Sequence, residues 1–154
     1  MYKTHIKVYL RNSLSMITRA SKLIEARPDI PSAKLLPNMS TNEHFQNKVL
    51  RPIIKFQNNL FIEVFKNYIR KNKNRFYELN VKNRLLFIEH ALQKDIKFRN
   101  SIKGMILGQF TVSEYAEYIQ DSSALNKRMI NLVIKRIQDQ VQLLEPNYSY
   151  QQAH

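Results

Sequence analysis

The stretch STNEHFQNKVLRPIIKFQNNLFIEVFKNYIRKN, residues 40–72, decides the fold class. Ser40 and Glu43, three residues apart, form the pattern of a capping box, in which each side chain bonds an otherwise unpaired backbone N–H at a helix start. Apolar residues then recur at steps of three and four: Phe45, Val49, Ile53, Phe56, Leu60, Val64 and Tyr68. The pattern predicts one long helix to about residue 72. Because Pro52 removes a backbone hydrogen bond, we expect a kink or short break near Leu50.

A second long helix is predicted after the polar stretch KNKN, residues 71–74. Asn80 can accept a hydrogen bond from the first helical turn, as N-cap residues do. The apolar line that follows is Val81, Leu85, Ile88, Leu92, Ile96, Ile102 and Ile106, and Arg99 interrupts it. Gly104 and Gly108 lie four apart and therefore on one face, where another helix can approach closely. Gly108 can equally end this helix as its C-cap.

Two further helices complete the predicted bundle. Thr111 and Glu114 form a second capping box for a short helix to about Gln120, and Ser122 or Ser123 can cap the last helix. The apolar residues of the last helix are Leu125, Met129, Leu132, Ile137, Val141 and Leu144. No segment shows the alternation of a strand. The sequence therefore predicts an all-α fold, a helical bundle of two long helices plus a short helix and a C-terminal helix, with an appended N-terminal amphipathic helix.

The first 39 residues differ in composition from the rest. Residues 4–26 carry an amphipathic stripe of Ile6, Leu10, Leu14, Ile17, Ala20 and Ile24, and seven Lys or Arg precede residue 40 against two acids. A basic amphipathic stripe is typical of a terminal helix lying on the bundle, which is the interpretation we favour. The same composition also suits a targeting presequence or a membrane-surface helix. Three prolines in residues 27–37 predict a linker. We expect a helix and linker over 1–39, a bundle domain over 40–146 and a disordered tail over 147–154.

Composition limits the classes of function. A chain of 154 residues can bury one core, and zero Cys removes disulfides, thiolate metal sites and thiol nucleophiles from this sequence. No apolar run approaches the 18 residues or more that a membrane span needs, so we expect a cytoplasmic protein without a transmembrane segment. The formal net charge of +13 favours an anionic partner, and residues 40–154 still carry 18 Lys/Arg against 10 Asp/Glu.

Residues 110–130 have the outline of a helix-turn-helix module, which would indicate DNA binding. Ala116 takes the small inward position of the first helix, and Ile119 its last core position. Asn126, however, stands where the second helix should bury a branched side chain. Three carboxylates would also lie near the DNA phosphates and weaken binding: Glu114, Glu117 and Asp121. Nucleic-acid binding through this degenerate segment is therefore our third hypothesis.

A basic segment follows the first long helix. Seven Lys/Arg and one acid lie between Lys66 and Arg84, with Phe76 and Tyr77 in the middle. Basic residues interleaved with aromatics can hold a phosphate backbone and stack a base. The alternative, which we favour, is a solvated turn whose two aromatic side chains plug the end of the bundle. The candidate binding residues here are Lys66, Arg70, Lys71, Lys73 and Arg75.

Candidates for catalysis are few. The weak candidates are Glu63 on the first long helix and Glu89 and His90 on the second. A carboxylate beside a histidine can transfer protons if the two lie about 3–4 Å apart or share a water. The sequence contains neither the Glu-x-x-His nor the His-Glu-x-x-His spacing of metal sites. We therefore predict no metal and no cofactor.

Three stretches resemble a family of small all-helical bacterial proteins that are often automatically labelled "glyoxalase": NEHFQNKVLRPIIKFQNNLFIEVFKNYI, ALQKDIKFRNSIKGMILGQFT and SSALNKRMINLVIKRI. The likeness spans about residues 41–145. It implies that a site shared by the family lies in residues 95–111 together with 122–128. Polar contacts there would come from Asn100, Asn126, Lys127 and Arg128.

Two main hypotheses remain open. We favour a non-enzymatic basic interaction module that binds a protein or anionic partner. The alternative is a small enzyme or ligand-binding protein with a cleft between the long helices, as the glyoxalase label would suggest. The first predicts a clustered positive surface, and the second predicts a pocket with convergent polar groups.

Overall fold

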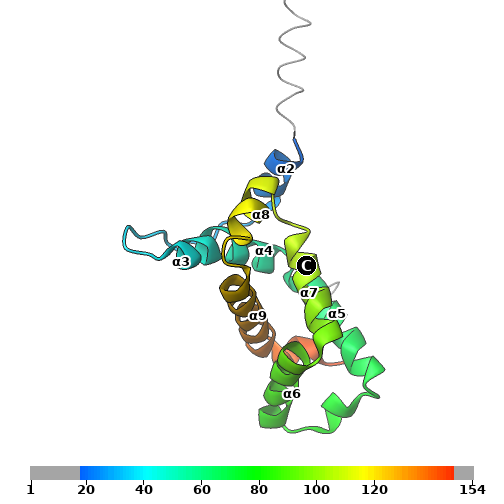
Figure 1. Cartoon of the computed structure of the whole chain (residues 1–154). Coiled ribbons are helices and arrows are strands. Elements are labelled where there is room, and N and C mark those ends of the chain that lie inside the picture. Colours follow the sequence, from blue (N-terminus) through cyan, green and yellow to red (C-terminus); the bar gives the residue numbers. More distant parts are fainter. Residues whose placement is uncertain (1–17, 148–154) are drawn as a thin grey trace, which may run out of the picture.

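The computed structural model describes residues 18–147, in which the regular elements are helices and no β-strand occurs (Figure 1). The predicted all-α class is therefore confirmed. The N-terminal stripe before residue 18 and the tail after residue 147 lie outside the described residues. The α-helices are α2 (Arg19–Ala26), α3 (Thr41–Phe45), α4 (Arg51–Phe56), α5 (Asn58–Lys71), α6 (Val81–Lys94), α7 (Ile96–Leu107), α8 (Val112–Tyr118) and α9 (Ser122–Gln138).

The first predicted long helix contains a π-helical turn and is interrupted once, at Gln57. The Ser40–Glu43 capping box starts α3 as expected, and a π-helical turn, Gln46–Leu50, then precedes α4. This irregularity lies where a kink or short break was expected, and the helix continues through it; Pro52, in the first turn of α4, has no N–H to donate. The break at Gln57 separates α4 from α5 and was not predicted.

The break at Gln57 changes which face of the helix is buried. Phe56 and Leu60, predicted on the core stripe, are 48% and 49% exposed. The buried residues of α5 are instead Phe61, Ile62, Phe65 and Ile69. The predicted stripe is therefore wrong at Phe56 and Leu60, which flank the break at Gln57, whereas Val64 and Tyr68 pack against the core as predicted.

The second predicted long helix is also broken, at Asp95. Asn80 caps α6 as expected. Asp95, however, adopts an extended backbone (φ −81°, ψ 98°) that ends α6, and its side chain accepts a hydrogen bond from the Phe98 N–H to start α7. The hydroxyl of Tyr68 on α5 donates to the same carboxyl group at 3.1 Å. Ile96 consequently lies in the first turn of α7 and is 61% exposed, against the prediction.

The C-terminal third of the described chain places α9 against most other elements. The Thr111–Glu114 capping box is present at the start of α8. The caps predicted for the last helix are wrong, since Asp121 is the N-cap of α9 and its side chain makes no capping bond. The helix ends at Gln138, and Val141 and Leu144 belong to a 3₁₀ turn. Contacts of α9 reach α4, α5, α6 and α7, so it is the central helix of the fold.

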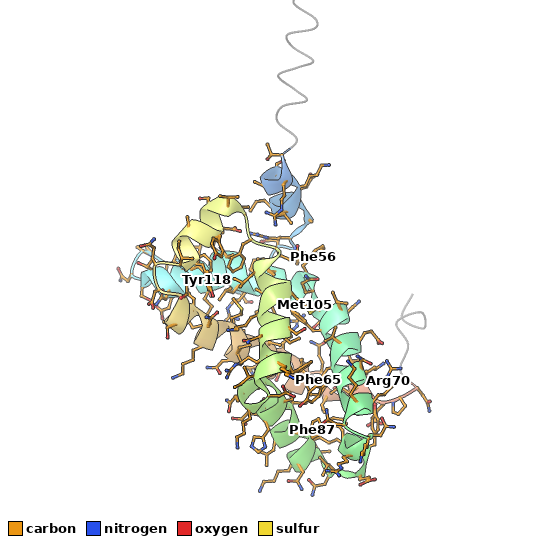
Figure 2. All side chains as sticks on the ribbon, turned by 45° about the vertical axis from the view of Figure 1, so that its right-hand side comes forward. Phe56, Phe65, Arg70, Phe87, Met105 and Tyr118 are labelled. Carbon is orange, nitrogen blue, oxygen red and sulfur yellow. The ribbon has the colours of Figure 1, made fainter. Side chains whose placement is uncertain are left out.

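Aromatic side chains fill the end of the core between α5 and α6. Phe65 is fully buried and its ring contacts those of Tyr68, Phe87 and Phe98, with centroids 5.7, 6.3 and 5.8 Å away. Figure 2 shows Phe65 and Phe87 at this end of the core, with Arg70 at the outer side of α5.

Of the two roles predicted for the glycines, the structure shows one. A Cβ added to Gly104 would meet no atom within 4 Å, so no helix approaches that face. The proposed close packing is therefore wrong. Gly108 is the C-cap of α7, as the alternative prediction held.

Helix α2 is attached to the α7–α8 corner by arginines rather than by apolar burial (Figure 1). Arg19 donates to the carbonyls of Gly108 and Phe110. Arg27 binds both carboxylate oxygens of Glu114, at 2.6 and 2.8 Å, and the side chains are 8% and 12% exposed. These contacts cross the predicted division at residue 39, which itself stays a prediction.

Candidate anion-binding site between α7 and α9

The weak catalytic candidates are not brought together. Glu63 is exposed and its carboxylate contacts Lys66 one turn away, with 3.3 Å between Oε1 and Nζ. Within residues 18–147, no hydrogen bond or ion pair joins Glu63, Glu89 and His90 to one another. The same part of the chain holds no cluster of three or more side chains suited to a metal ion.

The aromatic residues of the basic segment belong to the core. Phe76 is fully buried, and the Tyr77 hydroxyl donates to the Leu144 carbonyl at 2.8 Å. The guanidinium of Arg84 lies over the Phe76 ring, 5.1 Å from its centroid, and pairs with Glu145. The favoured interpretation, a plug at the end of the bundle, agrees with these contacts. The exposed cations Arg70, Lys71, Lys73 and Arg75 lie just before it in the chain, and we call them the bundle-end cations.

The helix-turn-helix outline does not match the packing of α8 and α9. Three residues, 119–121, do join the two helices. Ala116 and Ile119, predicted to face inward, are exposed, and Tyr118 is the buried residue of α8. The Tyr118 hydroxyl donates to Asn126 Oδ1 at 2.8 Å, so Asn126 connects the helices instead of a branched apolar side chain.

A pocket of about 460 Å³ opens between α7 and α9, next to the end of α6. Its lining is Gln93, Arg99, Lys103, Ser123, Asn126, Lys127, Ile130 and Asn131, and we call it the α7–α9 pocket. Most of these residues come from the two segments in which the family resemblance placed a site. Three lining residues are cationic, four carry amides or a hydroxyl, and none is acidic. Such a lining favours an anion.

The break at Asp95 positions one of these cations. Because α6 ends there, its last carbonyls lack helical partners, and Arg99 Nη1 donates to the Gln93 carbonyl at 2.9 Å. Lys103 lies one turn further along α7, on the same face. The carboxyl group of Asp95 serves the α7 cap, and the hydrogen bond from the Phe98 N–H is the main cause of its lowered pKa.

Helix α9 supplies the opposite wall. Asn126 Oδ1 is occupied by the Tyr118 hydroxyl, so its amide group has N–H donors to offer. Lys127 is exposed, and neither it nor Lys103 forms an ion pair within the described residues. No side chain caps the start of α9, where Ser123 lines the pocket, and the positive end of the helix dipole adds to the local potential.

All charged side chains of the two helices that form the walls of the pocket, α7 and α9, are positive. Helices α7 and α9 contain no Asp or Glu, and their cations are Lys97, Arg99, Lys103, Lys127, Arg128, Lys135 and Arg136. The short helix α8, in contrast, carries Glu114 and Glu117 and no Lys or Arg. The pocket therefore lies in the basic part of the described chain.

A second pocket, of about 370 Å³, is also lined by cationic side chains, but these already bind other residues of the chain. It is formed by residues of the 30–32 segment, α4 and α9. Lys135 pairs with Asp139 at 3.2 Å, Lys55 donates to the Asp29 carbonyl, and Arg136 donates to Asn58. These three cations already have partners, whereas Lys103 and Lys127 of the α7–α9 pocket have none within residues 18–147, so the α7–α9 pocket is the better candidate for binding an anion.

Sequence reasoning found part of this site. Asn126 and Lys127 line the pocket, whereas Asn100 is exposed outside the lining and Arg128 donates to Gln46 on the π-helical turn. The bundle-end cations and Lys66 lie elsewhere. The lining residues that were missed are Gln93, Arg99, Lys103, Ser123, Ile130 and Asn131. The available signal was Arg99, which interrupts the apolar line, with Lys103 four residues later.

Comparisons with known proteins do not identify the chain. No protein-family model matches it, and neither the curated proteins nor the solved structures include a match. The resemblance to the helical bacterial family therefore stays a prediction. None of the described helices is long and apolar enough to cross a membrane.

Proposed function

We propose that this chain is a basic helical interaction module that binds an anionic partner through the α7–α9 pocket. The observation that carries the proposal is the lining of that pocket, which has three cations, several neutral hydrogen-bond donors and no carboxylate. Binding requires fixed groups of this kind, whereas acid–base catalysis needs a proton acceptor within hydrogen-bond reach of the substrate.

A protein partner that presents a compact anionic group fits these observations better than a nucleic acid. Single-stranded nucleic acids use exposed aromatic side chains for stacking, and Phe76 in the basic segment is fully buried. The pocket cations form a compact cluster, separate from the bundle-end cations, and the acidic helix α8 begins only a few residues after α7. A compact anionic group matches this distribution more closely than an extended phosphate backbone.

The test compares two doubly substituted proteins that have lost the same charge. Lys103→Gln/Lys127→Gln removes two pocket cations, and Lys71→Gln/Arg75→Gln removes two bundle-end cations. Binding of a fluorescein-labelled glutamate-rich peptide is measured by fluorescence anisotropy. We expect the pocket variant to bind about two- to thirtyfold more weakly, since each exposed charge pair contributes about 0.2–1 kcal/mol. The bundle-end variant should bind nearly as the wild type does.

Equal weakening in both variants would contradict the proposal, because net charge alone would then govern binding. A single-stranded oligonucleotide of the same charge is measured in parallel. If it binds more tightly than the peptide, and the bundle-end variant loses that binding, the nucleic-acid hypothesis replaces this one.

A further inference from the structure

We infer that the anionic group received by the α7–α9 pocket is a phosphate monoester. This inference rests on the proposed function and specifies the chemistry of its ligand. It follows from the charge of the lining, from its neutral donors and from the size of the pocket.

The charge of the lining matches a dianion. Arg99 and Lys103 approach from α7, and Lys127 approaches from α9. A phosphate monoester carries about −1.5 to −2 at pH 7, whereas a carboxylate carries a single charge. Because no lining residue is acidic, a carboxylate would leave the cations poorly neutralised. Because both walls of the pocket are positively charged, the lining favours a phosphate monoester over a carboxylate.

Neutral donors complete the match. A phosphate monoester offers three terminal oxygens, each an acceptor of hydrogen bonds. The hydroxyl of Ser123 and the amides of Gln93 and Asn131 line the pocket. Asn126 is oriented by the Tyr118 hydroxyl, which occupies its Oδ1 and leaves its Nδ2 hydrogens as donors. The lining thus combines charge with several donors.

The size of the pocket leaves room for the group that carries the phosphate. A volume of about 460 Å³ falls within the range of small-molecule sites. Ile130 supplies an apolar side chain among the polar lining residues. The carrier can be a phosphorylated side chain or a small phosphorylated molecule, which present the same group to the lining.

The experiment uses the full chain and a matched pair of single substitutions. Asn126→Asp places a carboxylate in the pocket while keeping an acceptor for the Tyr118 hydroxyl. Asn100→Asp adds the same charge on α7 outside the lining. Inorganic phosphate, O-phosphoserine, a phosphoserine peptide and free glutamate are titrated at one ionic strength and pH 7.5. Backbone amide shifts in ¹H–¹⁵N spectra report both affinity and location.

We expect phosphate and O-phosphoserine to shift the amides around Arg99, Lys103 and residues 123–127. Both should bind about tenfold more tightly than glutamate, because charge-assisted bonds to a dianion are stronger. Asn126→Asp should weaken phosphate binding by about tenfold or more, and Asn100→Asp by less than about twofold. Tighter binding of the peptide than of O-phosphoserine identifies a protein source, and equal binding identifies a small phosphorylated molecule.

Two results would overturn the inference, and they differ in what they leave standing. If glutamate binds as tightly as O-phosphoserine, while the glutamate-rich peptide still requires Lys103 and Lys127, the pocket is a general anion site and the proposed function survives. If phosphate shifts only the amides near the bundle-end cations, or none, and the peptide ignores Lys103 and Lys127, both proposals fail.

Discussion

The contrast between Phe65 and Phe56 offers a decisive test of the helix register. Phe65 is fully buried, and its ring lies within 6.5 Å of those of Tyr68, Phe76, Phe87 and Phe98. Phe→Ala substitutions in cores cost about 3–5 kcal/mol, and each aromatic pair adds about 0.5–1.5 kcal/mol beyond area burial. With four ring partners, we expect Phe65→Ala to lower the free energy of unfolding by about 4–5 kcal/mol.

Phe56 is the matched control, because the sequence stripe and the structure disagree about it. Its side chain is 48% exposed, so Phe56→Ala should cost less than about 1 kcal/mol. The assay is urea denaturation followed by far-ultraviolet circular dichroism, which suits a chain without Trp. If Phe65→Ala does not fold, Phe65→Leu takes its place and should still cost more than Phe56→Ala. A larger loss for Phe56→Ala than for either Phe65 variant would refute the register.

Two further predictions concern stability. Burial raises the pKa of Glu114, but hydrogen bonds from Arg27 and the Thr111 N–H, with the charge of Arg27, outweigh it and leave the pKa lowered from 4.5. Its ion pair therefore stabilises the fold in full above pH 4.5, and this contribution is lost as the pH falls through the lowered value. Glu114→Gln, which keeps a capping acceptor, should cost about 2–3 kcal/mol at pH 7 and progressively less in acid, with exposed Glu117→Gln as the control in urea titrations. Gly104→Ala should raise the free energy of unfolding by up to about 1 kcal/mol, and with it the thermal midpoint, since the added Cβ meets open space. Gly108→Ala should gain less, because its Cβ would lie 3.3 Å from the Gly104 carbonyl oxygen; calorimetry of both variants checks the order.

The fold class and the helix starts could be predicted because they depend on neighbouring residues. The Ser40–Glu43 and Thr111–Glu114 boxes and the Asn80 cap involve partners three residues apart. No distant contact is needed to form them, and they occur where the sequence placed them.

The breaks at Gln57 and Asp95 could not be predicted from periodicity. Apolar residues continue at helical spacing across both positions, so the stripe reads as unbroken. The structure supports each break by contacts with remote residues: Gln57 donates to the Met105 carbonyl, and the Tyr68 hydroxyl donates to Asp95. Tertiary bonds of this kind leave no local signature, and they override the helical pattern. Asp95 also carries a local signal, since its side chain caps α7 through the Phe98 N–H three residues later, but the continuing apolar spacing concealed it.

The candidate site was partly predictable for the same reason. Asn126 and Lys127 follow a helix start that the sequence shows, and they line the pocket. The other wall depends on where α7 begins, which Asp95 determines. In the sequence, Arg99 is visible as an interruption of the apolar line. Its role could not be predicted, because the Gln93 carbonyl that it binds lacks a helical partner only when the helix breaks at Asp95.

Arg99 therefore has two roles that its pocket neighbours do not share. It satisfies a carbonyl at the end of α6, where the helix dipole is negative, and it presents a cation to the pocket. We predict that Arg99→Gln lowers both anion affinity and stability, the latter by up to about 1 kcal/mol for one exposed hydrogen bond. Lys103→Gln/Lys127→Gln should lower affinity alone, since neither lysine forms a hydrogen bond or ion pair within residues 18–147. Parallel urea and anisotropy measurements separate the two effects, and unchanged affinity in Arg99→Gln would remove this arginine from the binding site while leaving its structural role intact.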